Sequence, residues 1–186
     1  MRAPPTERGD ASFSPIVERF DRTQHDMSRF SCGNSALDDY VRRLVVRDEE
    51  QHTAAAYVLV DPAAVHQSRR VIGYYTISSF SLTRNQARRR DRDKHLGAYD
   101  PVPAALIGRL ALAIEVQGQG LGSVLLLAAL GRILIIREGM GIAAAVVHAI
   151  DEAAALFYEH HGFIRFRDEP SHLYYPLATF AATLNV

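Results

Sequence analysis

The chain has 186 residues, of which 48% are hydrophobic and 23% charged, and 21 acidic residues balance 21 basic ones. This composition excludes low-complexity disorder, collagen and a coiled-coil rod, and the length suits one domain. The single cysteine, Cys32, excludes a disulfide framework and a cysteine-based zinc site, and zero net charge leaves any attraction to nucleic acid or membrane to local clusters.

The first third of the chain predicts an arm, a strand and an amphipathic helix. Residues 1–14 carry no apolar core, so they predict a flexible arm and not a signal peptide. Residues 15–20 predict a first strand. Residues 35–38 resemble a capping box, and a helical apolar face follows them. That face consists of Leu37, Tyr40, Val41, Leu44 and Val45.

The middle of the chain predicts three strands. Residues 56–60 and 70–82 read as strands joined by a turn that starts at Asp61-Pro62, and the second of them alternates in the manner of a pleated strand. Residues 84–100 are polar and predict a loop or a short surface helix. Residues 104–114 are almost continuously apolar, which is typical of a strand buried on both faces.

The last third predicts a long helix, a short helix and three further strands. Because Arg132 lies inside the most hydrophobic window, we expect a buried helix and not a membrane span, and therefore a cytoplasmic protein. We predict one α/β domain of α+β type over residues 15–186, with a mixed, mostly antiparallel sheet flanked by helices. The later elements are a helix to about Arg137, a strand over 142–149, a helix between Asp151 and Gly162, and strands over 163–167 and 173–177.

A glycine-rich turn, Gln117 to Ser123, joins the buried strand to the long helix. Glycines allow close backbone approach, and amides at a helix N-terminus bind phosphate, although such a turn can also be purely structural. Its G-x-G-x-G spacing does not fit the Rossmann fingerprint, and it lacks the Gly-Lys-Ser/Thr of a Walker loop. Through Gln117, Gly120 and Gly122 it resembles the Gln/Arg-x-x-Gly-x-Gly/Ala loop of the GNAT (GCN5-related) N-acetyltransferases.

This resemblance implies that acetyl-CoA is the cosubstrate and that the turn holds its pyrophosphate. The same resemblance implies a slim track for the pantetheine arm, past small residues of the later helix. No metal site is expected, because His160 and His161 project about 100° apart on a helix. The implied cofactor-binding residues are Leu110, Ala111, Leu112, Gln117, Gly118, Gln119, Gly120, Leu121, Gly122, Ser123, Asp151 and Ala154.

The later helix also resembles the second motif of that family, which ends in a tyrosine near the thioester. Tyr158 lies close to two helical turns after Asp151 and is our candidate acid for the departing thiolate. A phenol near pKa 10 protonating a thiolate near 8.5 is uphill by roughly 2 kcal/mol, which a helix N-terminus could offset. The alternative is that Tyr158 only packs beneath its helix.

The acceptor amine must react as the neutral base, yet residues 104–114 contain no carboxylate and no histidine. At pH 7 a lysine ε-amine is neutral only about 0.04% of the time, against about 10% for an α-amine near pKa 8. The sequence therefore favours an α-amino acceptor. His148 is either a base, directly or through a water, or a structural histidine. Arg109 interrupts a buried strand and predicts either a salt bridge or an anion contact at the cleft.

A narrower resemblance, over about residues 16–177, is to TacT-type GNAT toxins. It rests on short stretches around 25–40, 70–75 and 101–111, which follow one another in the same order as in those toxins, together with the two motifs above. Tyr40 stands where tryptophan is frequent. The resemblance implies acetylation of the amino acid on charged tRNA, a ribbon-helix-helix antitoxin as partner, and a homodimer. The candidate tRNA contacts are Arg42, Arg43, Arg88, Arg89 and Arg90, and the alternative is that these arginines are solvated charges on the surface.

Two other functions remain open from the sequence. One is a GNAT enzyme that acetylates a small amine, an antibiotic or a protein N-terminus. The other is an inactive module that binds CoA or an antitoxin without transferring acetyl groups. Salt-dependent tRNA binding separates the first from a tRNA-acetylating toxin, and loss of activity in Tyr158→Phe separates the second from any enzyme.

Overall fold

The computed structural model describes residues 15–60 and 69–184, so the predicted arm and the Asp61-Pro62 turn lie outside the described part. Within it, an eight-stranded sheet has the order β1-β3-β4-β5-β6-β8-β7, and β2 pairs with β4 beside that path. The strands are β1 (Ile16–Arg19), β2 (His25–Asp26), β3 (Ala55–Val60), β4 (Arg69–Leu82), β5 (Val102–Leu112), β6 (Ala144–His148), β7 (Ile164–Arg165) and β8 (His172–Pro176).

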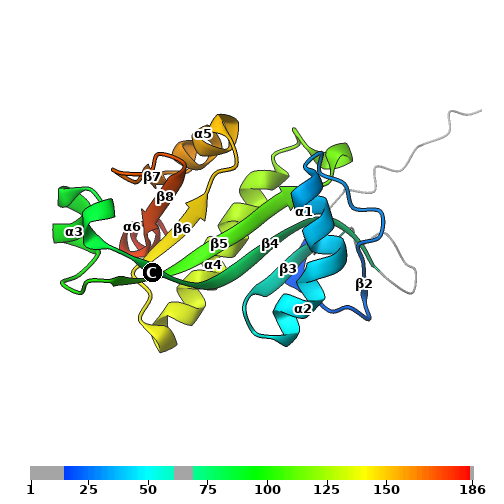
Figure 1. Cartoon of the computed structure of the whole chain (residues 1–186), viewed down its shortest axis with the longest axis horizontal. Coiled ribbons are helices and arrows are strands. Elements are labelled where there is room, and N and C mark those ends of the chain that lie inside the picture. Colours follow the sequence, from blue (N-terminus) through cyan, green and yellow to red (C-terminus); the bar gives the residue numbers. More distant parts are fainter. Residues whose placement is uncertain (1–14, 61–68, 185–186) are drawn as a thin grey trace, which may run out of the picture.

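Helices cover both faces of this sheet (Figure 1). The segment α1–η1–α2 lies in front of β3 and β4, and α4 runs behind β4 and β5. Within the described ranges, no helix combines the length and apolar character needed to cross a membrane. The helices are α1 (Ser35–Asp39), the π-helical η1 (Tyr40–Leu44), α2 (Val45–Glu50), the 3-10 turns η2 (Arg84–Gln86) and η3 (Ile114–Val116), α3 (Arg89–His95), α4 (Leu121–Met140), α5 (Glu152–His160) and α6 (Leu177–Thr183).

The strands β5 and β6 diverge in the middle of the sheet. They pair in parallel only from Ala104–Ile107 to Ala144–Val147, after which β5 continues to Leu112. The divergence begins at a bulge: Thr76 of β4 opposes Arg109 and Ile77 opposes Ile107, which leaves Gly108 as the extra residue. A bulge bends its strand and increases its twist. We call the resulting gap in the ladder the β5–β6 opening, and Figure 1 shows the two strands parting there.

The predicted fold class is confirmed, with corrections at the element level. Asn34 and not Ser35 caps the first helix, because its side chain accepts the Ala36 and Leu37 amides at 3.1 and 3.2 Å. Of the loop and the short surface helix predicted for residues 84–100, the structure contains the helix, α3. The sequence did not predict the small strand β2 or the helix α6, and the latter packs Leu177 and Phe180 into the core.

Candidate active site

The glycine-rich turn places a row of free amides at the start of α4. Gly118 and Gly120 have φ values of +75° and +79°, which glycine adopts without strain. None of the N–H groups from Gly118 to Gly122 donates a hydrogen bond to another described residue. The Gln117 side chain anchors the turn, since its Nε2 donates to the carbonyls of Cys32 at 3.0 Å and Leu112 at 2.9 Å.

This turn fits the diphosphate of acetyl-CoA. A Cβ built on Gly118 or Gly120 would meet no atom within 4 Å, so space lies open beside the free amides. The positive end of the α4 dipole adds to the attraction for an anion. The expected contacts of Leu110, Ala111 and Leu112 with the cosubstrate stay predictions, but these residues lie on the part of β5 that borders the opening.

His161 joins the end of α5 to the start of α4. His161 Nδ1 lies 2.8 Å from the Phe157 carbonyl, which can only accept, so this nitrogen donates. Nε2 then accepts from the Ser123 hydroxyl, also at 2.8 Å. A Cβ on Gly122 would lie 3.5 Å from the Phe157 ring. These contacts fix α5, and with it Tyr158, against the glycine-rich turn.

The helix α5 begins as the sequence predicts. Asp151 is its N-cap, and its Oδ1 accepts the Ala154 amide at 2.7 Å. One oxygen of the Asp151 carboxylate is therefore already engaged in a hydrogen bond with its own helix. A contact of Asp151 or Ala154 with the pantetheine arm stays a prediction.

The Tyr158 side chain is buried, with 7% of its surface exposed. It packs against Phe157 and Phe163, with ring centroids 5.3 and 5.5 Å away. Burial raises the pKa of Tyr158 to about 12, and among the described residues no group hydrogen-bonds its hydroxyl. A phenol in this setting keeps its proton, and its raised pKa makes transfer of that proton to a thiolate near pKa 8.5 more uphill than it is for an ordinary phenol.

Arg109 lies on the opposite face of the sheet, beside the opening. Its guanidinium carbon lies 3.5 Å from the centroid of the Tyr40 ring, a cation–π contact. Tyr40 in turn stacks on Tyr74 at 6.2 Å. In the described part of the chain, no carboxylate lies within ion-pair distance of Arg109. The predicted salt bridge is therefore not found there, and the guanidinium N–H groups are available to an anion.

His148 flanks the opening from β6, on the same face as Arg109. It is half-buried, and its ring stacks on His172 with centroids 3.7 Å apart and planes 14° apart. Burial and the neighbouring His172 lower the pKa of His148. The sequence did not single out His172, because only the pairing of β6 with β8 brings the two rings together.

The predicted tRNA-binding arginines form two groups at opposite ends of the sheet (Figure 1). On η1, Arg42 donates to the Phe30 carbonyl and Arg43 lies 3.7 Å from Asp39. On and beside α3, Arg88 and Arg90 line a cleft of about 330 Å³ together with His95, and Arg89 is exposed. All five remain candidate contacts.

Cys32 is a turn residue, as expected. Burial raises the pKa of its thiol, and its sulfur lies 3.7 Å from the Asn34 carbonyl. Its own carbonyl receives the Gln117 side chain. The residue therefore supports the glycine-rich turn and does not act as a thiolate nucleophile.

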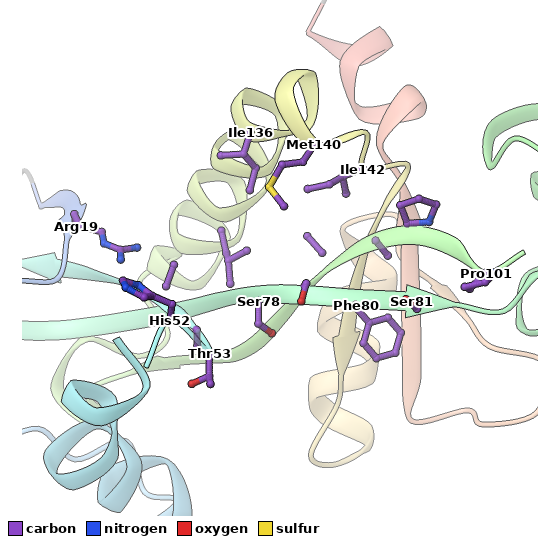
Figure 2. A pocket seen from close by; sticks show the side chains of 17 residues that line it. Arg19, His52, Thr53, Ser78, Phe80, Ser81, Pro101, Ile136, Met140 and Ile142 are labelled. Carbon is purple, nitrogen blue, oxygen red and sulfur yellow. The ribbon is translucent and has the colours of Figure 1, made fainter. Parts of the chain in front are cut away.

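A separate apolar groove of about 590 Å³ lies at the far end of α4 (Figure 2). Ile136 and Met140 of α4 and Ile142 line one side of it, and Ile77 and Ser79 of β4 line the other. The helix is about 30 Å long, so this groove is distinct from the glycine-rich turn at the other end. Beyond Ile77, the outer edge of β4 pairs with no described strand and borders the groove.

Comparisons with known proteins agree with this geometry. Residues 29–165 match the family model described as an acetyltransferase (GNAT) domain. The chain is 35% identical over 148 residues to the tRNA-acetylating toxin of Mycobacterium tuberculosis, spanning 80% of this chain and 84% of that protein.

Two solved structures are also similar. AtaT complexed with acetyl-methionyl-tRNAfMet has a TM-score of 0.83 at 27% identity, over 92% of this chain and 99% of that one. An AtaT mutant bound to the C-terminus of the antitoxin AtaR and acetyl-CoA has a TM-score of 0.78 at 26% identity, with the same coverage.

Proposed function

This chain belongs to the GNAT acetyltransferase family, and from that premise we propose that it transfers an acetyl group from acetyl-CoA to the α-amino group of aminoacyl-tRNA. One observation carries the proposal: free amides and a buried tyrosine lie on one face of the β5–β6 opening, and an arginine without an ion pair among the described residues lies on the other. The similarity to a tRNA-acetylating toxin and to AtaT with acetyl-methionyl-tRNAfMet supports the acceptor.

Each group has a role set by its chemistry. Acetyl-CoA, when bound, supplies an acetyl thioester as the acyl donor. The amides from Gly118 to Gly122 hold its diphosphate by hydrogen bonds that the protein itself does not satisfy. Tyr158 donates its proton to the departing sulfur, so that CoA leaves as a thiol. Arg109 contacts a phosphate near the acceptor end of the tRNA, with Tyr40 as its platform.

The acceptor class follows from what β5 lacks. Thr76 and Arg109 are the polar side chains at the level of the bulge, and neither is a base at neutral pH. An amine that is substantially neutral at pH 7 needs less help than a lysine side chain. The α-amine of an amino acid esterified to tRNA meets this condition. Because charged tRNA is a cytoplasmic substrate, the proposal places the enzyme in the cytoplasm.

The proposal also includes two protein partners. The similarity to AtaT bound to the antitoxin AtaR supports a ribbon-helix-helix antitoxin that neutralises this chain. A second copy of the chain is proposed for the groove in Figure 2, because an apolar surface beside an open strand edge favours pairing with another chain.

The homodimer is tested by light scattering. Met140 is 68% exposed at the groove, so Met140→Glu should shift the mass from dimer to monomer without unfolding the protein. Leu184→Glu, which is also exposed but lies away from the groove, should leave the dimer intact. A wild-type monomer would overturn the dimer and leave the enzymatic proposal standing.

The enzymatic proposal is tested by competition among acceptors. The purified protein is incubated with labelled acetyl-CoA and, in parallel, charged tRNA, deacylated tRNA, a lysine peptide and a small primary amine. We expect label on charged tRNA alone. Label on the peptide or the small amine, and none on charged tRNA, would overturn the proposed acceptor.

A further inference from the structure

The histidine pair on the acceptor side of the opening has an unusual hydrogen-bonding state. The Nε2 atom of His148 is buried and has no hydrogen-bond partner among the described residues. A buried polar atom left without a partner is destabilising, so its presence calls for an explanation. The stacked contact with His172 holds the ring in place without satisfying this nitrogen.

Aromatic rings and one carboxylate surround the pair. Phe80 of β4 meets the His148 ring edge-on at 5.7 Å, and Phe166 meets His172 at the same distance. Glu169 Oε2 lies 3.3 Å from Nδ1 of His172, and the His172 amide donates to the Glu169 carbonyl at 3.0 Å. Glu169 therefore fixes the orientation of His172, and the stack transmits that orientation to His148.

The pair lies where the strands part. Val147 is the last residue of β6 that pairs with β5, and His148 follows it. Alternation along β6 puts His148 on the same sheet face as Val146. Arg109 lies on that same face, on the other side of the β5–β6 opening. An acceptor bound between Arg109 and His148 would approach the opening from this face, opposite the glycine-rich turn.

The titratable groups that act on His148 within the described residues are His172 on β8 and Glu169 before it, since the side chain that faces it from β4 is Phe80. His172 and burial lower the pKa of His148 below its usual 6.5, and Glu169 raises it by less. The imidazole is consequently neutral at pH 7 and can accept a proton.

We propose that His148 is the base that takes the proton from the acceptor amine, and that His172, held by Glu169, is its positioning residue. As the C–N bond forms between the amine and the acetyl carbonyl carbon, the C–S bond breaks. The amine proton passes to the His148 imidazole, and the sulfur leaves with the Tyr158 proton. This inference rests on the proposed acetyl transfer and deepens it.

The same pair restricts the class of acceptor. The pKa of an α-ammonium, near 8, lies much closer to the lowered pKa of the His148 imidazole than the pKa of a lysine, near 10.4, does. His148 therefore serves an α-amine far better than a lysine side chain.

The experiment compares His148→Ala, His148→Gln and the wild type. We expect kcat to fall roughly 100-fold or more in both variants, with melting temperature and CoA affinity unchanged. Added imidazole should restore a measurable part of the activity of His148→Ala alone. His160→Ala, at an exposed histidine on α5, should behave as wild type.

The positioning role is tested by the pH profile of kcat in His172→Phe, which keeps a ring in the stack. Because His172 lowers the pKa of His148, the loss of His172 should shift the acid limb of the kcat profile to higher pH. An acid limb that belongs to the acceptor amine would not move.

The activities of these variants and of the wild type decide between the proposals. A folded His148→Ala protein with activity within threefold of wild type, or without imidazole rescue, overturns the role of His148. An unmoved acid limb in His172→Phe overturns the role of His172. If the wild type acetylates a free amine but not charged tRNA, the acceptor is wrong and the same variants test His148 on that amine. No transfer to any amine overturns both proposals.

Discussion

At the scale of single residues, Tyr158 and Arg109 differ in charge: the Tyr158 phenol is neutral and the Arg109 guanidinium is positive. Tyr158 is buried among aromatic rings, which keeps its phenol neutral. Arg109 keeps its charge but has an aromatic ring and no carboxylate beside it among the described residues. One residue is thus prepared to donate a proton, and the other to bind an anion.

Tyr158→Phe removes the proton donor and little else. The hydroxyl has no hydrogen-bond partner among the described residues, so its loss should cost little stability. We expect kcat to fall by about 10²–10⁴-fold while the CoA dissociation constant and the melting temperature stay within error. A variant that retains full activity would show that Tyr158 only packs beneath its helix.

The raised pKa of Tyr158 gives a second prediction. The acid is active in its protonated form, and a pKa of about 12 keeps it protonated throughout the working range. The profile of kcat should therefore show no alkaline fall due to Tyr158 up to about pH 10. An alkaline limb near pH 9 that vanishes in Tyr158→Phe would contradict this placement of the phenol.

At the scale of elements, the two ends of α4 allow a matched pair of glycine variants. Gly120 has φ +79° and Gly141, at the other end of the helix, has φ +65°, so an alanine at either position costs about 1–2 kcal/mol. Gly120→Ala should weaken CoA binding about tenfold or more in calorimetry. Gly141→Ala should bind CoA within about threefold of wild type, and an equal loss of CoA affinity in both variants would contradict the proposed phosphate turn.

The turn was predictable from sequence because its chemistry is local. The glycine spacing and the start of an apolar helix can both be recognised from consecutive residues. The bulge at Gly108 and the His148–His172 stack were not predictable, because each depends on the register between two strands distant in sequence. The partner of Arg109 was left open for the same reason: Tyr40 comes from a helix packed over the strand.

The misplaced helix start and the missed α6 have different causes. Asn34 and Ser35 are both good capping residues, and only the backbone conformation chooses between them. The residues of α6, Leu177–Thr183, lack charged residues that would mark a solvent-facing side. Their helical state is set by packing against β8, which the local pattern does not report.

At the scale of the whole molecule, charge is locally clustered although the sum is zero. The arginines of η1 and α3 lie at opposite ends of the sheet, with the opening between them (Figure 1). A long polyanion such as tRNA can reach both ends at once, whereas a small amine cannot.

This arrangement predicts salt-sensitive tRNA binding. Each phosphate contact adds about 0.7–0.9 to the slope of log affinity against log salt. Arg88→Gln combined with Arg90→Gln should therefore lower that slope by about 1–2, measured by filter binding, with CoA affinity unchanged. An unchanged slope would remove α3 from the tRNA-binding surface.

The most direct test of the account asks which atom receives the acetyl group. After reaction with labelled acetyl-CoA, charged tRNA is treated with mild alkali, which cleaves the ester between amino acid and RNA. The account predicts that all label leaves the RNA as N-acetyl amino acid, and that Tyr158→Phe yields almost none. Label that remains on the RNA, or an unlabelled amino acid, would contradict it.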